Sequence, residues 1–219
     1  GETTIVYCER GYYNTRNDIG YFVKNSRVDY ENRTMYGDSI YFNRNKNFAS
    51  ATNNIRLIDT LNNSYVRGHY AEVFKEKDSV FITKRAVAIT VKDNDSIYVH
   101  ADTLRITGKP ENRILKGYYK ARFFKKGLPG EEPTSGKCDS IFVNEKNGIT
   151  KLLRNPILWT GENQMTGDTI HLLRNIETSK LDTLKVFKNA FIIQKDSAGY
   201  NQVKGERLIG LFTNNQLDT

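Results

Sequence analysis

One six-residue pattern recurs five times along the chain and constrains the fold more than any other feature. It reads GDSIYF at 37–42, KDSVFI at 77–82, NDSIYV at 94–99, CDSIFV at 138–143 and GDTIHL at 167–172. Asp followed by Ser or Thr is turn chemistry, because these short side chains hydrogen-bond the nearby backbone. The alternating apolar residues that follow are typical of a strand. Each copy therefore predicts a turn that leads into a strand, and repeated strand units are expected to stack on one another.

The apolar positions of this pattern lie two and four residues after each Asp. Because successive side chains of a strand point to opposite faces, these two positions share one face. We expect the five copies to build one apolar ladder on the inner side of a sheet. Its members are Ile40, Phe42, Val80, Ile82, Ile97, Val99, Ile141, Val143, Ile170 and Leu172.

A second pattern places a basic residue before Gly, an aromatic ring and Tyr. It occurs as RGYY at 10–13, RGHY at 67–70 and KGYY at 116–119. Removing a Pro- and Gly-rich segment at 126–137 would give the last two copies the same spacing to the next Asp motif. We therefore expect both copies to open the same hairpin, one of them with a longer surface loop at 126–137.

Most of the remaining chain divides into apolar runs of about 5–8 residues between Asn, Asp and Gly turns, as expected for strands. Examples are NIRLIDT at 54–60, RAVAITVK at 85–92, NPILWTG at 155–161 and NAFIIQK at 189–195. No amphipathic helix is indicated. The sequence predicts an all-β protein with one domain over 1–219, built as an elongated stack of degenerate hairpin repeats. A sandwich and an open, folded-over sheet both fit this pattern.

The net charge of +8 favours attraction to polyanions. Along the sequence, however, the basic residues are dispersed, and the strongest clusters are only Lys84-Arg85 and Lys125-Lys126. A nucleic-acid partner is therefore not expected, because such proteins gather Lys and Arg on one face. No apolar run approaches the roughly 20 residues of a membrane helix. The chain starts at Gly1 without an apolar signal region, so any targeting segment is expected to lie outside it.

Catalytic and metal sites are not indicated. His69 and His171 replace aromatic residues of the repeats, and His100 has only Asp102 near it in sequence. The motif aspartates open separate strands, so we do not expect them to converge as paired carboxylates. Several oxygen-bearing side chains close together in sequence, as a calcium-binding loop requires, occur only at 93–95. Cys8 and Cys138 lack metal-ligand spacing, and their pairing stays open. We predict a protein that is not an enzyme and has no cofactor and no metal.

Taken in series, the two patterns resemble the OstA/LptA family of lipopolysaccharide-transport proteins. The resemblance rests on RGHYAEVFKEKDSVFITKRAVAIT at 67–90 and NDSIYVHADTLRI at 94–106, and it continues in KCDSIFV at 137–143 and LLRNPILWTGENQMTGDTIHLL at 152–173. It extends over roughly residues 5–195. The last stretch, 201–219, looks like the start of a further repeat.

The resemblance implies a β-jelly-roll, or "β-taco", which is a sheet folded into a V with an apolar interior. It also implies a periplasmic, outer-membrane-associated protein that binds the acyl chains of lipopolysaccharide (lipid A) inside the V. The ladder residues given above would line this groove. Partners would be other lipopolysaccharide-transport proteins, or further copies of the chain, joined through sheet edges.

Two other functions fit the same strands. A carbohydrate-binding module would use Trp159 and surface Tyr residues as stacking platforms, outside a closed core. A glycan-active enzyme on a β-solenoid would require acidic residues that converge in a cleft. The ladder alone does not separate a filled core from an open groove.

Overall fold

The computed structural model describes residues 4–92, 95–178, 180–213 and 216–217. These residues form strands joined by tight turns, with two short 3₁₀ turns, η1 (Lys75–Lys77) and η2 (Pro110–Asn112). The strands are β1 (Thr4–Tyr7), β2 (Arg10–Asn14), β3 (Ile19–Tyr30), β4 (Arg33–Asn43), β5 (Phe48–Asp59), β6 (Ser64–Phe74), β7 (Ser79–Lys92), β8 (Asp95–Thr107), β9 (Ile114–Lys125), β10 (Thr134–Asn144), β11 (Ile149–Leu153), β12 (Ile157–Thr160), β13 (Asn163–Thr166), β14 (Thr169–Arg174), β15 (Leu181–Asp196), β16 (Gly199–Thr213) and β17 (Gln216–Leu217).

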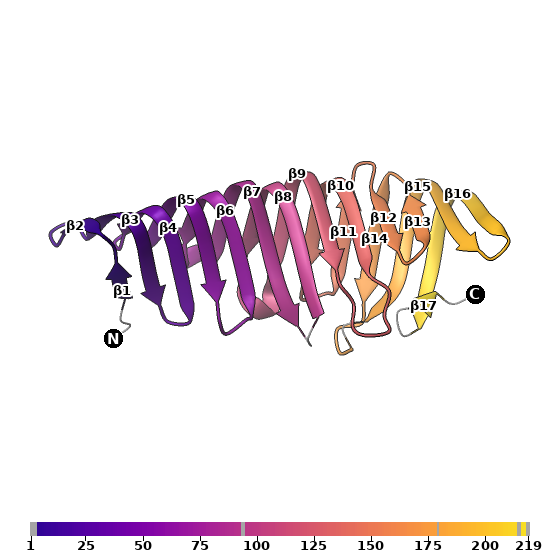
Figure 1. Cartoon of the computed structure of the whole chain (residues 1–219), viewed down its shortest axis with the longest axis horizontal. Helices are drawn as coiled ribbons and strands as arrows, with labels where there is room; N and C mark the ends of the chain where they lie inside the picture. The colour runs from indigo at the N-terminus through magenta and orange to yellow at the C-terminus, as the bar shows by residue number, and fades with distance from the viewer. Residues whose placement is uncertain (1–3, 93–94, 179, 214–215, 218–219) are drawn as a thin grey trace.

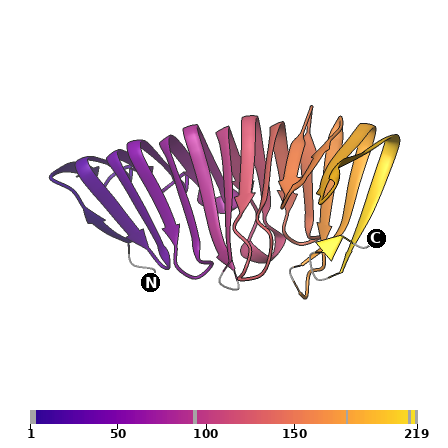
Figure 2. The ribbon, with the colours of Figure 1, turned by 45° about the vertical axis from the view of Figure 1, so that its right-hand side comes forward.

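The strands stack along one axis in the order of the chain (Figures 1 and 2). Every pairing is antiparallel, and β3 to β10 follow one another as a continuous meander. After β10 two rungs are split into separate strands: β10 pairs with β11 along one half and with β12 along the other, and β15 pairs in the same way with β14 and β13. The prediction of an all-β, elongated, antiparallel folded-over sheet is confirmed.

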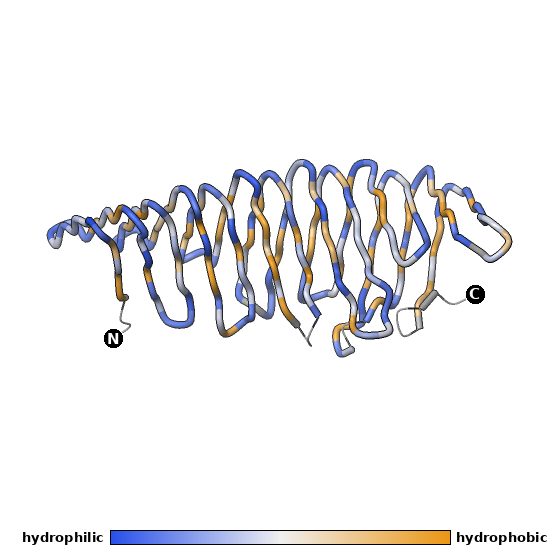
Figure 3. The backbone as a smooth tube through the Cα atoms, viewed as in Figure 1, coloured by the Kyte–Doolittle hydropathy of each residue, from blue (hydrophilic) through white to orange (hydrophobic). Residues whose placement is uncertain are grey.

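Each long strand bends near its middle, and the bends line up as a ridge along the molecule. At the ridge, five strand pairs place two residues opposite one, which is a β-bulge that bends the strand. These doubled residues, with which we group Arg154-Asn155 between β11 and β12, all have positive φ: Lys24-Asn25, Asn53-Asn54, Lys84-Arg85, Tyr119-Lys120, Arg154-Asn155 and Lys188-Asn189. The ridge is largely hydrophilic in Figure 3. The runs of about 5–8 residues that the sequence predicted as strands correspond to the halves of these bent strands.

The ridge divides the sheet into two limbs. We call limb A the halves that contain Phe22, Ile40 and Ile141, and limb B the halves that contain Val28, Val66 and Phe123. The free ends of the limbs form the mouth, where the hairpin turns lie. Limb A and limb B meet directly in the interior, since a Cβ on Gly136 of limb B would lie 3.2 Å from Leu152 Cδ1 of limb A.

The motif aspartates occupy two different places, which corrects the expectation that each one opens a strand. Asp38 and Asp139 lie within β4 and β10 at the ridge, and Asp168 lies there between β13 and β14. Their carboxylates accept hydrogen bonds from the doubled residues of the next strand. Asn54 Nδ2 donates to Asp38 at 2.9 Å, and Arg154 Nη1 donates to Asp139 at 3.0 Å.

Asp78 and Asp95 instead lie at the mouth. Asp78 follows η1 with φ of 39°, and Asp95 begins β8. Asp93 and Asn94, part of the calcium-like stretch, lie outside the described residues. The prediction that the Asp lies in a turn leading into a strand is thus right for these two copies only. Asp occurs both in turns at the mouth and in bulges at the ridge.

The two Gly-aromatic copies do not open the same hairpin. Gly68 lies on β6, which runs from limb B to limb A and turns at the limb A mouth. Gly117 lies on β9, which runs the opposite way and turns at the limb B mouth. The loop there is shorter than predicted, because β10 already begins at Thr134. Its residues are 126–133.

The core is the inner face of both limbs. One row along limb A, next to the ridge, runs Phe22, Ile40, Ala51, Ala71, Ile82, Leu104, Gly117, Ile141, Leu152, Ile170, Val186 and Leu208. Most of these side chains are fully buried. Among the described residues, no helix has the length and apolar character needed to span a membrane.

Candidate functional site: an apolar cleft between the limbs

The interior between the limbs is not completely filled. It contains two cavities of about 430 Å³ and about 470 Å³. Both are lined by Ala88 and Thr90 of limb B and by Leu115 of limb A, so they are neighbouring compartments of one cleft. Ligand sites in proteins commonly have volumes of roughly 300–1,000 Å³. Each compartment therefore has the size of a small-molecule site.

All ten predicted ladder residues lie on the inner face. Ile40, Ile82, Val99, Ile141, Ile170 and Leu172 are buried, while Phe42, Val80, Ile97 and Val143 are partly buried against the core. One compartment is lined by Ile97, Val99, Ile141, Val143 and Leu172, and the other by Ile40, Phe42 and Val80. Ile82 and Ile170 are enclosed at the ridge and line neither compartment.

The ladder describes mainly one wall of the cleft, because eight of its ten members lie on limb A. The facing wall comes from limb B and, apart from Ile97 and Val99, was missed. Its second inner row contains Val28, Met35, Leu57, Val66, Ala88, Val99, Phe123, Leu158, Met165 and Ile192. Ile106 and Leu115 on limb A were also missed. Alternation within β8 and β9 is the signal that points to them.

Charged side chains cross the mouth. Asp59 Oδ2 on limb B lies 3.5 Å from Arg33 Nε and 3.9 Å from Nη2 of Arg113, which precedes β9 on limb A. The Asp59 and Arg113 side chains are only 13% and 12% exposed. Arg113 Nε is buried and finds no acceptor among the described residues. One more donor is thus directed into this part of the mouth.

A second cross-mouth contact joins Lys75 and Tyr30. Lys75, in the turn at the limb A mouth, donates a hydrogen bond to the phenol oxygen of Tyr30 at the end of the limb B half of β3. The ammonium also lies 4.4 Å from the centroid of the Tyr30 ring. The limbs are therefore held together at their free ends by polar contacts, while the interior between them is apolar.

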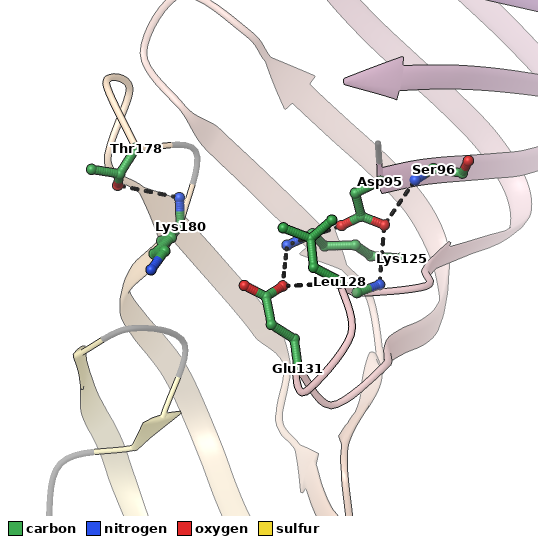
Figure 4. A network of polar contacts seen from close by, with 8 residues as sticks. Asp95, Ser96, Lys125, Leu128, Glu131, Thr178 and Lys180 are labelled. Atoms are coloured by element: carbon green, nitrogen blue, oxygen red, sulfur yellow. Dashed lines mark hydrogen bonds and ion pairs between the residues drawn. The ribbon is translucent and has the colours of Figure 1, made fainter. Parts of the chain in front are cut away.

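Figure 4 shows a third polar group, at the limb B mouth beside loop 126–133. Lys125 Nζ lies 3.3 Å from Asp95 Oδ2 and 3.8 Å from Glu131 Oε2. The backbone N–H groups of Ser96 and Gly127 donate to Asp95 Oδ1 at 2.8 Å and 3.0 Å. Asp95 therefore fixes the loop to the start of β8. Across the figure, the Lys180 N–H donates to Thr178 Oγ1 at 3.4 Å.

The histidines do not approach these acids. His171 lies on the outer face of limb A, where its ring meets Phe187 edge to face at 4.9 Å. Burial, followed by the charges of Lys151 and Lys185, lowers the pKa of His171. His69 lies at the ridge and His100 on the outer face of limb B. In the described part of the chain, no three His, Cys, Asp or Glu side chains come together as metal ligands.

No protein-family model matches the chain, and no curated protein matches it. Its class is therefore defined by the architecture: an elongated antiparallel sheet, folded along a bulged ridge, that encloses an apolar cleft with a charged mouth.

Proposed function

We infer that the chain is a non-enzymatic periplasmic protein that binds lipopolysaccharide and carries it toward the outer membrane. The observation that carries this proposal is the cleft, with two neighbouring apolar compartments of about 430 Å³ and about 470 Å³. The resemblance of the repeats to the OstA/LptA family supports the same function. Other transport proteins of that system, or further copies of this chain, would join through the sheet edges.

The physical chemistry of the cleft suits an acyl chain. Each CH₂ group moved from water into an apolar site is stabilised by about 0.8 kcal/mol. Contacts with Val80, Leu115 and Val143 have no preferred direction, so a bound chain can slide along the cleft. Sliding is required of a carrier.

The mouth suits the phosphate groups of the same lipid. Arg33 and Arg113 converge there, and a guanidinium binds phosphate through parallel hydrogen bonds. Arg113 Nε is available as a donor, as described above. A lipid with its chains between the limbs and its phosphates at the mouth would satisfy both groups.

The test is lipid extraction from protein purified from a Gram-negative host, with lipid A detected by mass spectrometry. Ile97→Asp and Val143→Asp place a charge in one compartment, so we expect them to abolish recovery of the lipid. The matched control is Tyr119→Asp, because Tyr119 is exposed at the ridge, away from the mouth, and Asp tolerates its positive φ. It should retain the lipid. Circular dichroism establishes that all three variants are folded.

A second arm covers lipid that is lost during purification. Wild-type protein is incubated with lipopolysaccharide, separated from micelles by gel filtration and extracted again. Lipid in the wild type and in Tyr119→Asp but not in the two cleft variants supports the proposal. Lipid-free wild-type protein in both arms, or equal recovery from every variant, contradicts it.

A further inference from the structure

The outer face of limb B carries a row of basic side chains that the sequence does not reveal. Arg56 of β5 pairs with Arg67 of β6, and Arg122 of β9 pairs with Lys137 of β10. His100 of β8 faces Arg122. We call these five residues the basic row. Only Val87 of β7 interrupts it, and its four Arg and Lys side chains are exposed.

The basic row has an energetic cost that only two ring contacts offset in part, since Arg56 lies 4.6 Å from the Tyr36 ring and Lys137 lies 5.7 Å from the Trp159 ring. Like charges directly opposite each other on neighbouring strands are destabilising. In the described residues, none of the four Arg and Lys side chains forms an ion pair. In the part of limb B that the structure describes, Asp29 is the one carboxylate in the outer rows, and it binds Arg27 at 2.7 Å at the N-terminal end. A surface that keeps several unpaired cations adjacent is complementary to an anionic polymer.

An aromatic row runs parallel to the basic row, two residues closer to the mouth. It consists of Tyr65, Tyr98, Phe124 and Trp159, and it is interrupted by Ile89 of β7 and Ser135 of β10. Tyr98 and Phe124 are 38% and 42% exposed, and their ring centroids lie 6.1 Å apart at 45°. Lys137 Nζ lies 5.7 Å from the Trp159 ring, which links the two rows. With a rise of about 3.4 Å per residue, the rows are roughly 7 Å apart.

We propose that this face binds a linear anionic polysaccharide, with its carboxylates or phosphates on the basic row and its sugar rings against the aromatic row. A sugar ring needs only one exposed aromatic face to stack on. A single-stranded nucleic acid fits less well, because successive bases stack on a series of open ring faces, whereas the Tyr98 and Phe124 rings lie against each other and are tilted by 45°. A membrane fits less well, because insertion requires apolar side chains that project further than these half-buried rings. The proposal is independent of the lipid cleft.

The experiment measures fluorescence anisotropy of labelled oligogalacturonate, a sugar chain with one carboxylate per ring, titrated with the intact protein. Arg67→Gln/Arg122→Gln should weaken binding by about tenfold or more, because each guanidinium contributes charge-assisted hydrogen bonds. The matched control is Lys116→Gln/Lys151→Gln, which removes the same charge from the outer face of limb A. It should change the affinity less than about threefold if the site is local.

A second comparison separates sugar from charge. Tyr98→Ser/Phe124→Ser should weaken binding of oligogalacturonate but leave binding of inorganic polyphosphate unchanged, and neutral dextran should not bind. Equal losses in the two charge variants would overturn the proposal, since binding would then follow net charge alone. Tighter binding of oligothymidylate or of anionic vesicles, lost in Arg67→Gln/Arg122→Gln, would also overturn it in favour of those partners. Circular dichroism melting confirms the fold of each variant.

Discussion

Cys8 and Cys138 are both free thiols, but their surroundings differ. Cys138 is buried on β10, and burial raises the pKa of its thiol to about 11. Because the thiolate is the nucleophile, only about 0.1% of such a thiol is reactive at pH 8. Cys8 is exposed between β1 and β2. We expect iodoacetamide to modify Cys8 alone in the native protein and both thiols in urea. Intact-mass spectrometry counts the adducts, and two adducts on native protein would contradict this assignment.

His171 predicts a pH dependence of stability. Its pKa is lowered by burial and by the charges of Lys151 and Lys185, while its ring packs on Phe187. The unfolded chain therefore takes up this proton at a higher pH than the folded chain does. Stability from this group is fully present above its ordinary pKa of about 6.5 and is lost as the pH falls from that value through the lowered pKa of the folded chain.

The corresponding variant is His171→Phe, which restores the aromatic residue found at this position in other copies of the motif. We expect its melting temperature to fall less than that of the wild type between pH 7 and pH 5. His69→Phe, at the exposed ridge, is the control and should follow the wild type. Identical pH profiles for His171→Phe and the wild type would show that His171 does not contribute.

At the scale of the elements, the ridge is the feature that bends each long strand. A left-handed backbone conformation, with positive φ, costs an ordinary residue about 1–2 kcal/mol. Asn tolerates this conformation better, and β-branched residues tolerate it least. Arg85 is exposed with φ of 60°. We expect Arg85→Asn to stabilise the protein by up to about 1 kcal/mol and Arg85→Val to destabilise it by about 1–2 kcal/mol. Urea unfolding measures both changes.

The control for the ridge is the same substitution on extended backbone. Arg105 lies on β8 on the outer face of limb A, where Asn is disfavoured in a strand. Arg105→Asn should therefore be neutral or slightly destabilising. A gain in stability at Arg105 as large as at Arg85 would show that the effect comes from lost charge and not from the backbone.

The ridge also explains how far the sequence could predict the cleft. Alternation from each Asp identified the inner residues on one side of the bend. On β4, however, the inward Met35 lies three residues before Asp38, whereas the inward Ile40 lies two residues after it. The inner face thus changes from odd to even positions at the bulge, so simple alternation cannot extend through it. Most of the limb B wall, all but Ile97 and Val99, was missed for this reason.

The basic row could not be recognised in the sequence either, because its members lie far apart along the chain. Arg56 and Arg67 are 11 residues apart in the chain but directly opposite in the sheet. Clusters of Lys and Arg along the sequence therefore indicated that the basic residues are dispersed. The register between neighbouring strands brings such residues together, and that register depends on turn lengths and ridge bulges. By contrast, the all-β class follows directly from the repeated short alternating runs.

At the scale of the whole molecule, each rung pairs only with the rungs before and after it. The stack therefore exposes inner-face and edge residues at its two ends, which no further rung covers in the described chain. The exposed apolar side chains there are Ile5, Tyr7 and Tyr12 on the first rung, and Tyr200, Val203, Ile209 and Leu211 on β16. Unpaired strand edges with apolar side chains are templates for pairing with another chain.

Association through these ends is the last prediction. Charges on an edge strand oppose pairing with a second strand, so Val203→Lys/Ile209→Lys should lower the association constant by about tenfold or more. The substitutions should change stability little, because both side chains are more than half exposed. Sedimentation velocity over a concentration series measures the association. Leu61→Lys, exposed in a turn at the mouth, is the matched control and should associate as the wild type does. A wild-type chain that sediments as a monomer at every concentration would contradict pairing between copies, and equal association of Leu61→Lys and the β16 variant would place the contact elsewhere.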